Sequence, residues 1–228
     1  KGEEVSELRG FQRALRERTA KMAPPPGPLP VLLPCYNGAR KLPNLTPLLA
    51  MLLAREGVPV LLHGVRADYG RVTTEAILAE FGMPTCASLQ VAQARLRDRD
   101  VSRRLAFVPL ALLSPGLDRL LAARLRIGLR GSGHTLAKLI DLFAGRAVRV
   151  VPVTHPEYLA RMRAFLAEAG TPALLLRGSE GEPCAGPKRA LEVDFLGGGE
   201  HRVLHADRPP GVALPEALDA KTTAAWTR

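Results

Sequence analysis

The segment from Val31 to Arg66 constrains the fold more than any other part of the chain. It opens with VLLP, a short apolar run that ends at a proline, and Tyr36-Asn37-Gly38 follows with residues that favour a turn. The apolar stretch 48–54 predicts a helix, and the apolar run 60–62 predicts a second strand. A strand, a loop, a helix and a strand in this order predict the crossover that joins parallel strands.

The loop before this helix is a candidate anion site. Backbone N–H groups that have no helical partner point out of the start of a helix, and the helix dipole adds positive potential there. Asn44 and Thr46 are candidate capping residues, and Gly57 is a natural end for the helix. The segment therefore has the build of a loop and helix that hold a phosphate group.

The rest of the chain predicts a mixed α/β fold, with a mainly parallel sheet flanked by helices and a smaller, discontinuous helical domain. We expect residues 1–22 and part of the basic, helical span 88–143 to form the helical domain, and 31–87 and 144–228 to form the α/β domain. A proline-rich linker, 23–30, connects them. Further strands are expected at 105–109, 148–153, 173–177, 190–195 and 202–204, and helices at 3–21, 110–128, 134–139 and 156–169.

The same segment resembles the phosphate-binding unit of the anthranilate phosphoribosyltransferases and the related nucleoside phosphorylases, glycosyl transferase family 3. That unit reads roughly GTGGD, a spacer, NxST, a helix and GVPVAKHGNR, and this chain aligns without a gap through PCYNG, NLTP and GVPVLLHGVR. The resemblance covers most of the chain and implies the fold just described. Because family members commonly dimerise through the helical domain, it also implies a homodimer. The first residues resemble the family's third and fourth helices, and the last stop within a predicted helix, so we expect the chain to be incomplete at both ends.

The departures from the family pattern fall on the groups that grip a small phosphorylated substrate. The glycine-rich loop reads Pro34-Cys35-Tyr36-Asn37, which lacks one N–H and adds side chains. The two adjacent acids that hold magnesium in the family fall on Pro183 and Cys184. Other replaced positions are Gly38, Leu62, Val65, Tyr69 and Gly70. We therefore expect no catalytic residue, metal or other cofactor. The alternative is a transferase that has rebuilt a magnesium site with Glu180 and Glu182.

Positive charge replaces the lost groups. Arg40 and Lys41 stand in the former phosphate loop, and Arg71 stands in the second loop. With NLTPLLA, HTLAKL and RGSEGEP, this pattern resembles the YbiB-type branch of the family, which is regarded as nucleic-acid-binding. The resemblance implies a basic groove that binds DNA, particularly single-stranded, or RNA without sequence specificity. The expected phosphate-binding residues are Tyr36, Asn37, Arg40, Lys41, Asn44, Thr46, His63, Arg66, Arg71, Arg124, Arg126, Arg130, His134 and Lys138.

Composition agrees with a polyanionic partner. The formal net charge is +10 and the pI is near 10.2, and the span 95–149 holds twelve Lys and Arg residues against four Asp. Aromatic residues are only 4% of the chain, so few side chains could stack on bases. Contacts to the nucleic-acid backbone should dominate, which predicts weak sequence preference and strong salt dependence.

Charge alone leaves other interpretations open. Arginine-rich runs usually mark solvated helix faces, and a binder of a small anionic metabolite would share this composition. His63 is more typical of a packed histidine than of a catalyst, because no nearby carboxylate or thiol could orient it. Three isolated cysteines indicate neither a zinc site nor a disulfide framework, which favours a reducing cytoplasm. No apolar run approaches the ~20 residues needed to cross a bilayer, so we expect no membrane partner.

Overall fold

The structure is a computed structural model that describes residues 3–66, 70–128, 131–186, 189–207, 211 and 213–228. Within these residues an eight-stranded sheet runs in the order β3-β2-β1-β4-β5-β7-β8, with β6 paired to β5 off this path. Strands β1 to β5 are joined by parallel pairs, and β6, β7 and β8 add antiparallel pairs. The strands are β1 (Val31–Cys35), β2 (Val60–Gly64), β3 (Leu105–Pro109), β4 (Val148–Val153), β5 (Ala173–Ser179), β6 (Glu182–Ala185), β7 (Leu191–Gly197) and β8 (Glu200–Ala206). The predicted mixed, mainly parallel sheet is confirmed.

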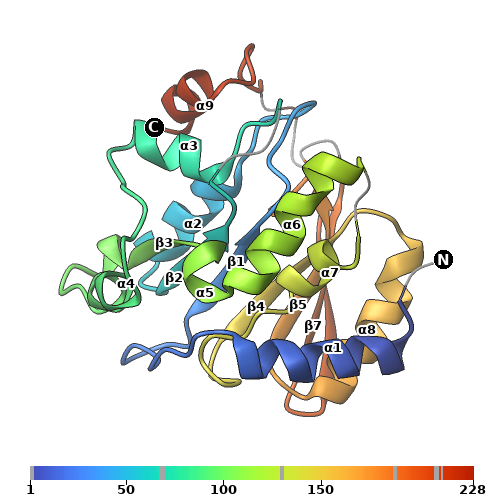
Figure 1. Ribbon diagram of the computed structural model, residues 1–228. Helices are drawn as coiled ribbons and strands as arrows, with labels where there is room; N and C mark the ends of the chain where they lie inside the picture. The colour runs from blue at the N-terminus through green and yellow to red at the C-terminus, as the bar shows by residue number, and fades with distance from the viewer. Residues whose placement is uncertain (1–2, 67–69, 129–130, 187–188, 208–210, 212) are drawn as a thin grey trace.

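Helices flank this sheet, as Figure 1 shows, with α6 crossing in front of it and α9 lying beside α3 at one end. They pack there because a parallel sheet is apolar on both faces and must be covered on both. The described helices are α1 (Val5–Arg18), α2 (Thr46–Arg55), α3 (Thr74–Glu80), α4 (Leu89–Leu96), α5 (Leu110–Leu113), α6 (Pro115–Ile127), α7 (Gly133–Ala137), α8 (Glu157–Ala169) and α9 (Ala220–Thr227), with a short 3₁₀ helix, Val101–Arg103.

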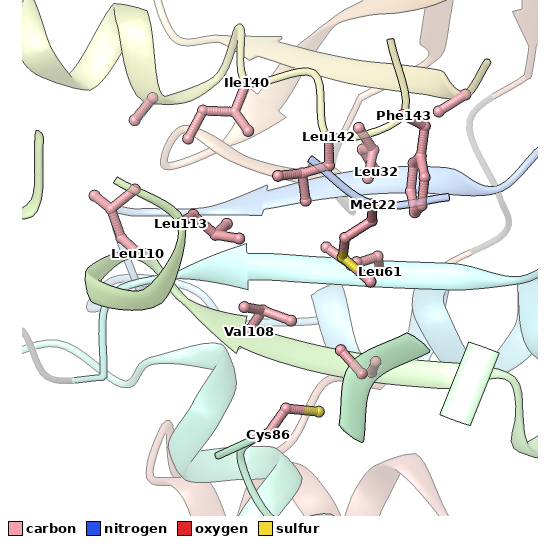
Figure 2. Close-up of a cluster of buried hydrophobic side chains, with 14 of the residues drawn as sticks. Met22, Leu32, Leu61, Cys86, Val108, Leu110, Leu113, Ile140, Leu142 and Phe143 are labelled. Atoms are coloured by element: carbon pink, nitrogen blue, oxygen red, sulfur yellow. The ribbon is translucent and has the colours of Figure 1, made fainter. Parts of the chain in front are cut away.

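The core follows from the alternation of side chains along the buried strands. In β1, Leu32 joins one apolar cluster and Leu33 joins another, because successive residues of a strand point to opposite faces. The first cluster is filled from α5 and the chain after α7, as Figure 2 shows for Leu110, Leu142 and Phe143 around the strands. The second is filled mainly from α2 and α3. All five residues of β1 are buried, which explains why it reads as a continuous apolar run.

Two local predictions were wrong. The helix expected at 110–128 is broken, because Ser114 adopts an extended φ of −154° between α5 and α6. Pro115 disfavours the helical conformation of the residue before it and has no N–H to continue the first helix. The helix α2 starts at Thr46, and its N-cap residue is Leu45, whose side chain makes no capping hydrogen bond. Asn44 instead accepts a hydrogen bond from the N–H of Thr46 at 3.2 Å.

Gly64 allows β1 and β2 to pair closely at their carboxyl ends. A Cβ at this position would lie 1.9 Å from the carbonyl oxygen of Cys35. We expect Gly64→Ala to lower the free energy of unfolding by about 2 kcal/mol or more, because the backbone of one strand must move. Urea denaturation measures the change.

Gly10→Ala provides the matched control. Gly10 is exposed in the middle of α1, and nothing lies within 4 Å of an added Cβ. Because alanine has the higher helix propensity, this variant should gain about 0.5–1 kcal/mol. Equal stability of the two variants would contradict the close approach of β1 and β2.

Candidate anion-binding site

The loop after β1 lies at the carboxyl edge of the parallel strands. The sheet order changes direction there, since β2 and β3 lie on one side of β1 and β4 lies on the other. In open α/β sheets a ligand binds in the crevice at such a point, beyond the carboxyl ends of the strands. The site predicted from the sequence is therefore in the place where this architecture puts ligands.

Two carboxylates of the chain itself fill this loop. We call residues 37–42 the nest, because five of their backbone N–H groups converge on two glutamates. The Oε1 atom of Glu182 accepts hydrogen bonds from the N–H groups of Asn37 and Gly38, at 2.7 and 2.8 Å. The Oε1 atom of Glu180 accepts from Arg40, Lys41 and Leu42, at 3.0, 2.7 and 3.0 Å. The nest thus already holds two anionic groups.

The two carboxylates differ in environment. Glu182 is 1% exposed, and burial raises its pKa against the opposing effect of the N–H donors, Lys138 and Thr74. Partial burial also acts to raise the pKa of Glu180, but its three N–H donors and Arg71 outweigh burial, so the pKa is lowered. Arg71 Nη1 lies 3.4 Å from Glu180 Oε2. Glu180 is therefore an ionised carboxylate at the exposed edge of the nest, and Glu182 is a buried carboxylate.

A tight hairpin between β5 and β6 brings the glutamates to the nest. Its two turn residues, Glu180 and Gly181, have φ values of +52° and +90°, which suits the turns that join twisted strands. Gly181 also permits close approach, because a Cβ there would lie 2.6 Å from Asn37 Nδ2. The same amide donates to the Gly181 carbonyl at 2.9 Å. Strand β6 was not predicted from the sequence, in which Gly181 was the only indication of a turn.

Five predicted phosphate-binding residues are buried, and four of them, Tyr36, Asn37, Asn44 and His63, have side-chain hydrogen-bond partners inside the protein. The Tyr36 hydroxyl lies 2.6 Å from His63 Nδ1, and both residues are 1% exposed. Burial lowers the pKa of His63 to about 3, so the ring is neutral near pH 7. Asn44 Nδ2 donates to Thr74 Oγ1 at 3.1 Å, and Thr46, like Asn37, is buried. In this structure these side chains support the loops and are not presented to solvent.

The remaining predicted residues lie nearer the surface. Arg40, Lys41, Arg66 and Arg126 are exposed. Arg71 is mostly buried and donates to the Gly38 carbonyl at 3.1 Å in addition to its ion pair. Lys138 donates to the Pro152 carbonyl at 2.8 Å. Arg130 lies outside the described residues.

A cavity of about 220 Å³ brings four of the predicted residues together, Tyr36, Arg66, Arg124 and His134. Its walls are mainly apolar, and Arg124 Nη1 lies 3.5 Å from His134 Nε2. Asp118 also lines it, and burial raises the pKa of this carboxyl. Arg40 and Lys41 belong to the nest and, like Arg126, do not line this cavity. The structure therefore does not bring the predicted residues together in one site.

A magnesium-bridged diphosphate does not fit the residues present. Among the described residues, no group of three or more His, Cys, Asp or Glu side chains could hold a metal ion. Both oxygens of Glu180 are engaged, by backbone N–H groups and by the Arg71 cation. The Oε1 atom of Glu182 is engaged by two N–H groups, while Thr74 Oγ1 lies 3.5 Å from its Oε2. The carboxylates that the transferase alternative assigns to magnesium thus serve as hydrogen-bond acceptors.

Burial of His63 predicts a pH dependence of stability. The unfolded chain takes up a proton at this residue near pH 6.5, whereas the folded chain does so only near pH 3. The unfolded state binds more protons between these values, so stability falls as the pH decreases, by up to about 1.4 kcal/mol per pH unit. His63→Gln should flatten the pH dependence of urea denaturation in this window. His205→Gln, at an exposed residue of β8, should not change it. A His63→Gln variant with the wild-type slope would contradict the shifted pKa.

Comparison with known proteins is consistent with this geometry. No protein-family model matches the chain. The uncharacterized protein YbiB of Escherichia coli (strain K12) is 43% identical over 230 residues, which cover 99% of this chain and 71% of YbiB. Anthranilate phosphoribosyltransferase of Thermus thermophilus is 26% identical, and the match covers 97% of this chain but 62% of the enzyme.

Solved structures show the same fold. The crystal structure of the Thermus thermophilus enzyme matches with a TM-score of 0.74 at 25% identity, over 100% of this chain and 68% of that chain. The Saccharomyces cerevisiae enzyme in complex with PRPP and Mg matches with a TM-score of 0.73 at 14% identity, over 98% and 62% of the two chains. In the described part of the chain, no helix combines the length and the apolar character needed to cross a membrane. The chain therefore belongs to the YbiB family and has the anthranilate phosphoribosyltransferase fold.

Proposed function

We propose that this protein binds nucleic acid without sequence specificity, and that it does not catalyse phosphoribosyl transfer. One observation carries the proposal. The nest, where this fold could hold a small phosphorylated ligand, is filled by Glu180 and Glu182, while the side chains of Arg40 and Lys41 beside it are exposed. Attraction for phosphate groups at the surface is retained, and the geometry for a small diphosphate is lost.

Electrostatics supports a long polyanion as the partner. Among the described residues, no ion pair involves the side chains of Arg40 or Lys41, whereas Arg66 has Glu75 at 3.7 Å. With a net charge of +10, the protein would attract a strand at long range and release counterions when it binds. We propose a basic groove in which Arg40, Lys41, Arg66 and Arg126 contact phosphates.

The proposal includes a homodimer and a cytoplasmic location. Two copies on one strand would gain affinity through their effective concentration, which favours long strands over short ones. The three cysteines are buried and free, which suits a reducing compartment. Binding that strengthens with strand length would support the two-site arrangement.

Charge reversal tests whether Arg40 and Lys41, the exposed cations of the nest, contribute to nucleic-acid binding. The variant Arg40→Glu with Lys41→Glu changes only side chains, so the backbone bonds to Glu180 are kept. We expect affinity for labelled single-stranded oligonucleotides, measured by fluorescence anisotropy, to fall roughly tenfold or more at low salt. If both side chains touch phosphate, the slope of log affinity against log salt should become shallower by about 1.4.

The matched control reverses two exposed arginines elsewhere, Arg55→Glu with Arg97→Glu, and has the same net charge. The control should bind the oligonucleotide more tightly than the variant with Arg40→Glu and Lys41→Glu, because only local contacts distinguish the two. Equal affinities and equal salt slopes would reject the assignment of Arg40 and Lys41. Phosphoribosyl diphosphate with magnesium serves as a competitor, and displacement of the strand by it would favour the transferase alternative. Tight binding of one nucleotide but not of long strands would favour a metabolite binder.

A further inference from the structure

The strand β8 leaves one edge of the sheet open. Among the described strands it pairs with β7 alone, and all seven of its residues, Glu200–Ala206, are exposed. Unpaired N–H and C=O groups along such an edge are a template for another strand, and proteins commonly protect them with proline, lysine or a β-bulge. This strand contains neither residue, and its pairing with β7 runs without a shift in register. The edge is therefore open to a further strand.

The turn between β7 and β8 determines which backbone groups face outward. Gly198 and Gly199 have φ values of +61° and +81°, as the two central residues of a type I′ turn do. In a two-residue turn the flanking residues, Gly197 and Glu200, form a hydrogen-bonded pair. Hydrogen-bonded and non-hydrogen-bonded pairs then alternate along the two strands. The residues whose N–H and C=O groups point away from β7 are therefore His201, Val203 and His205.

A second copy of this chain offers the same three residues in a matching pattern. In an antiparallel pair, outward-facing residues bond only to outward-facing residues, and a two-fold axis places one residue opposite its own copy. With Val203 opposite itself, His201 lies opposite His205 of the second copy, so all three residues are paired. Each of these pairs exchanges both N–H···O bonds. Centring the contact on Arg202 or on Leu204 leaves one of the three residues without an opposite residue in the strand.

The side chains of β8 suit this register. Val203 is 42% exposed and Leu204 is 53% exposed, so the pairing covers apolar surface. The guanidinium of Arg202 lies 5.5 Å from the centre of the Phe195 ring, and its Nη2 atom lies 3.0 Å from Glu200 Oε2. Leu204 is the residue opposite Arg202 in the Val203-centred register. Like charges are then not directly opposite, whereas centring on Arg202 would place two guanidinium groups against each other.

We propose that β8 is a self-association edge, on which a second copy of this chain pairs antiparallel with Val203 opposite itself. This isologous contact joins the two sheets into one continuous sheet. It is distinct from the helical domain, to which the family resemblance assigns a homodimer contact, and it does not rest on the proposed function. One pair of short strands buries less area than a standard interface, so we expect a Kd on the order of 10 µM or above.

The variant Val203→Pro tests the backbone bonds and keeps the hairpin. Proline lacks the N–H group, and it is tolerated on an edge strand where that N–H faces outward. Val203→Thr is the matched control, because threonine keeps both the N–H and the strand propensity. Sedimentation velocity is measured on nuclease-treated protein from about 1 to about 500 µM. We expect the wild type and Val203→Thr to associate as concentration rises, and Val203→Pro to associate roughly tenfold or more weakly.

Single cysteines map the register. The Cα atoms of a hydrogen-bonded pair lie about 5.5 Å apart, which suits a disulfide, whereas the two copies of Glu200 would lie about 20 Å apart. Val203→Cys should therefore form a linked dimer under mild oxidation, and Glu200→Cys should not. A mixture of Glu200→Cys and Ala206→Cys should form the mixed dimer, because these residues are opposite each other. The three native cysteines are buried.

The outcomes decide for or against the edge. Faster linking of Val203→Cys than of Glu200→Cys, with association weakened in Val203→Pro, would support it. Equal association of the proline and threonine variants would overturn it, because the contact would then lie elsewhere. Val203→Cys that links no faster than Glu200→Cys would also overturn it, even if the proline variant fails to fold. A wild type that shows no association over the whole concentration range would reject a second copy and leave the edge to another polypeptide.

Discussion

The arrangement of the site depends on the hydrogen bonds between the nest and the carboxylates of Glu180 and Glu182. Backbone N–H groups that face a crevice need an acceptor, and a buried donor without one is costly. In this protein the acceptors come from the chain itself, through the hairpin of β5 and β6. The same contacts fix the loop after β1 against a strand far away in the sequence. The shape of the loop and the position of the exposed cations Arg40 and Lys41 both follow from them.

Because the N–H groups of the nest are bonded to Glu180 and Glu182, the chain keeps the fold but does not leave these groups open to a diphosphate. The sheet and its helices match those of anthranilate phosphoribosyltransferase over the full chain. The groups that would receive a diphosphate are engaged within the protein, and both glutamates that could have bound magnesium serve as acceptors. A fold can be retained while its ligand position is filled by side chains, because the strands and the core do not depend on what the loops bind. The cations around the nest then remain as the feature that a partner would meet.

Much of the fold could be predicted from local patterns. The strands Val31–Cys35, Leu105–Pro109 and Val148–Val153 are apolar runs bounded by turn residues or prolines, and the structure confirms them. The break at Ser114 was missed because the leucine pattern continues through it, although Pro115 carried the signal. Strand β6 was missed because Glu182–Ala185 has no alternation, and its only indication was the turn before it.

The sequence by itself determined the α/β class, the loop at the carboxyl edge and the excess of positive charge. These properties depend on hydrophobic period, turn residues and composition, which are local or additive along the chain. Only the tertiary structure decided that Tyr36 and His63 face each other in the interior, and that Glu180 and Glu182 fill the nest. Each of these contacts joins residues 27 or more positions apart. The hydrophobic pattern of the sequence does not predict such pairs, because the order of the strands in the sheet decides which distant residues meet.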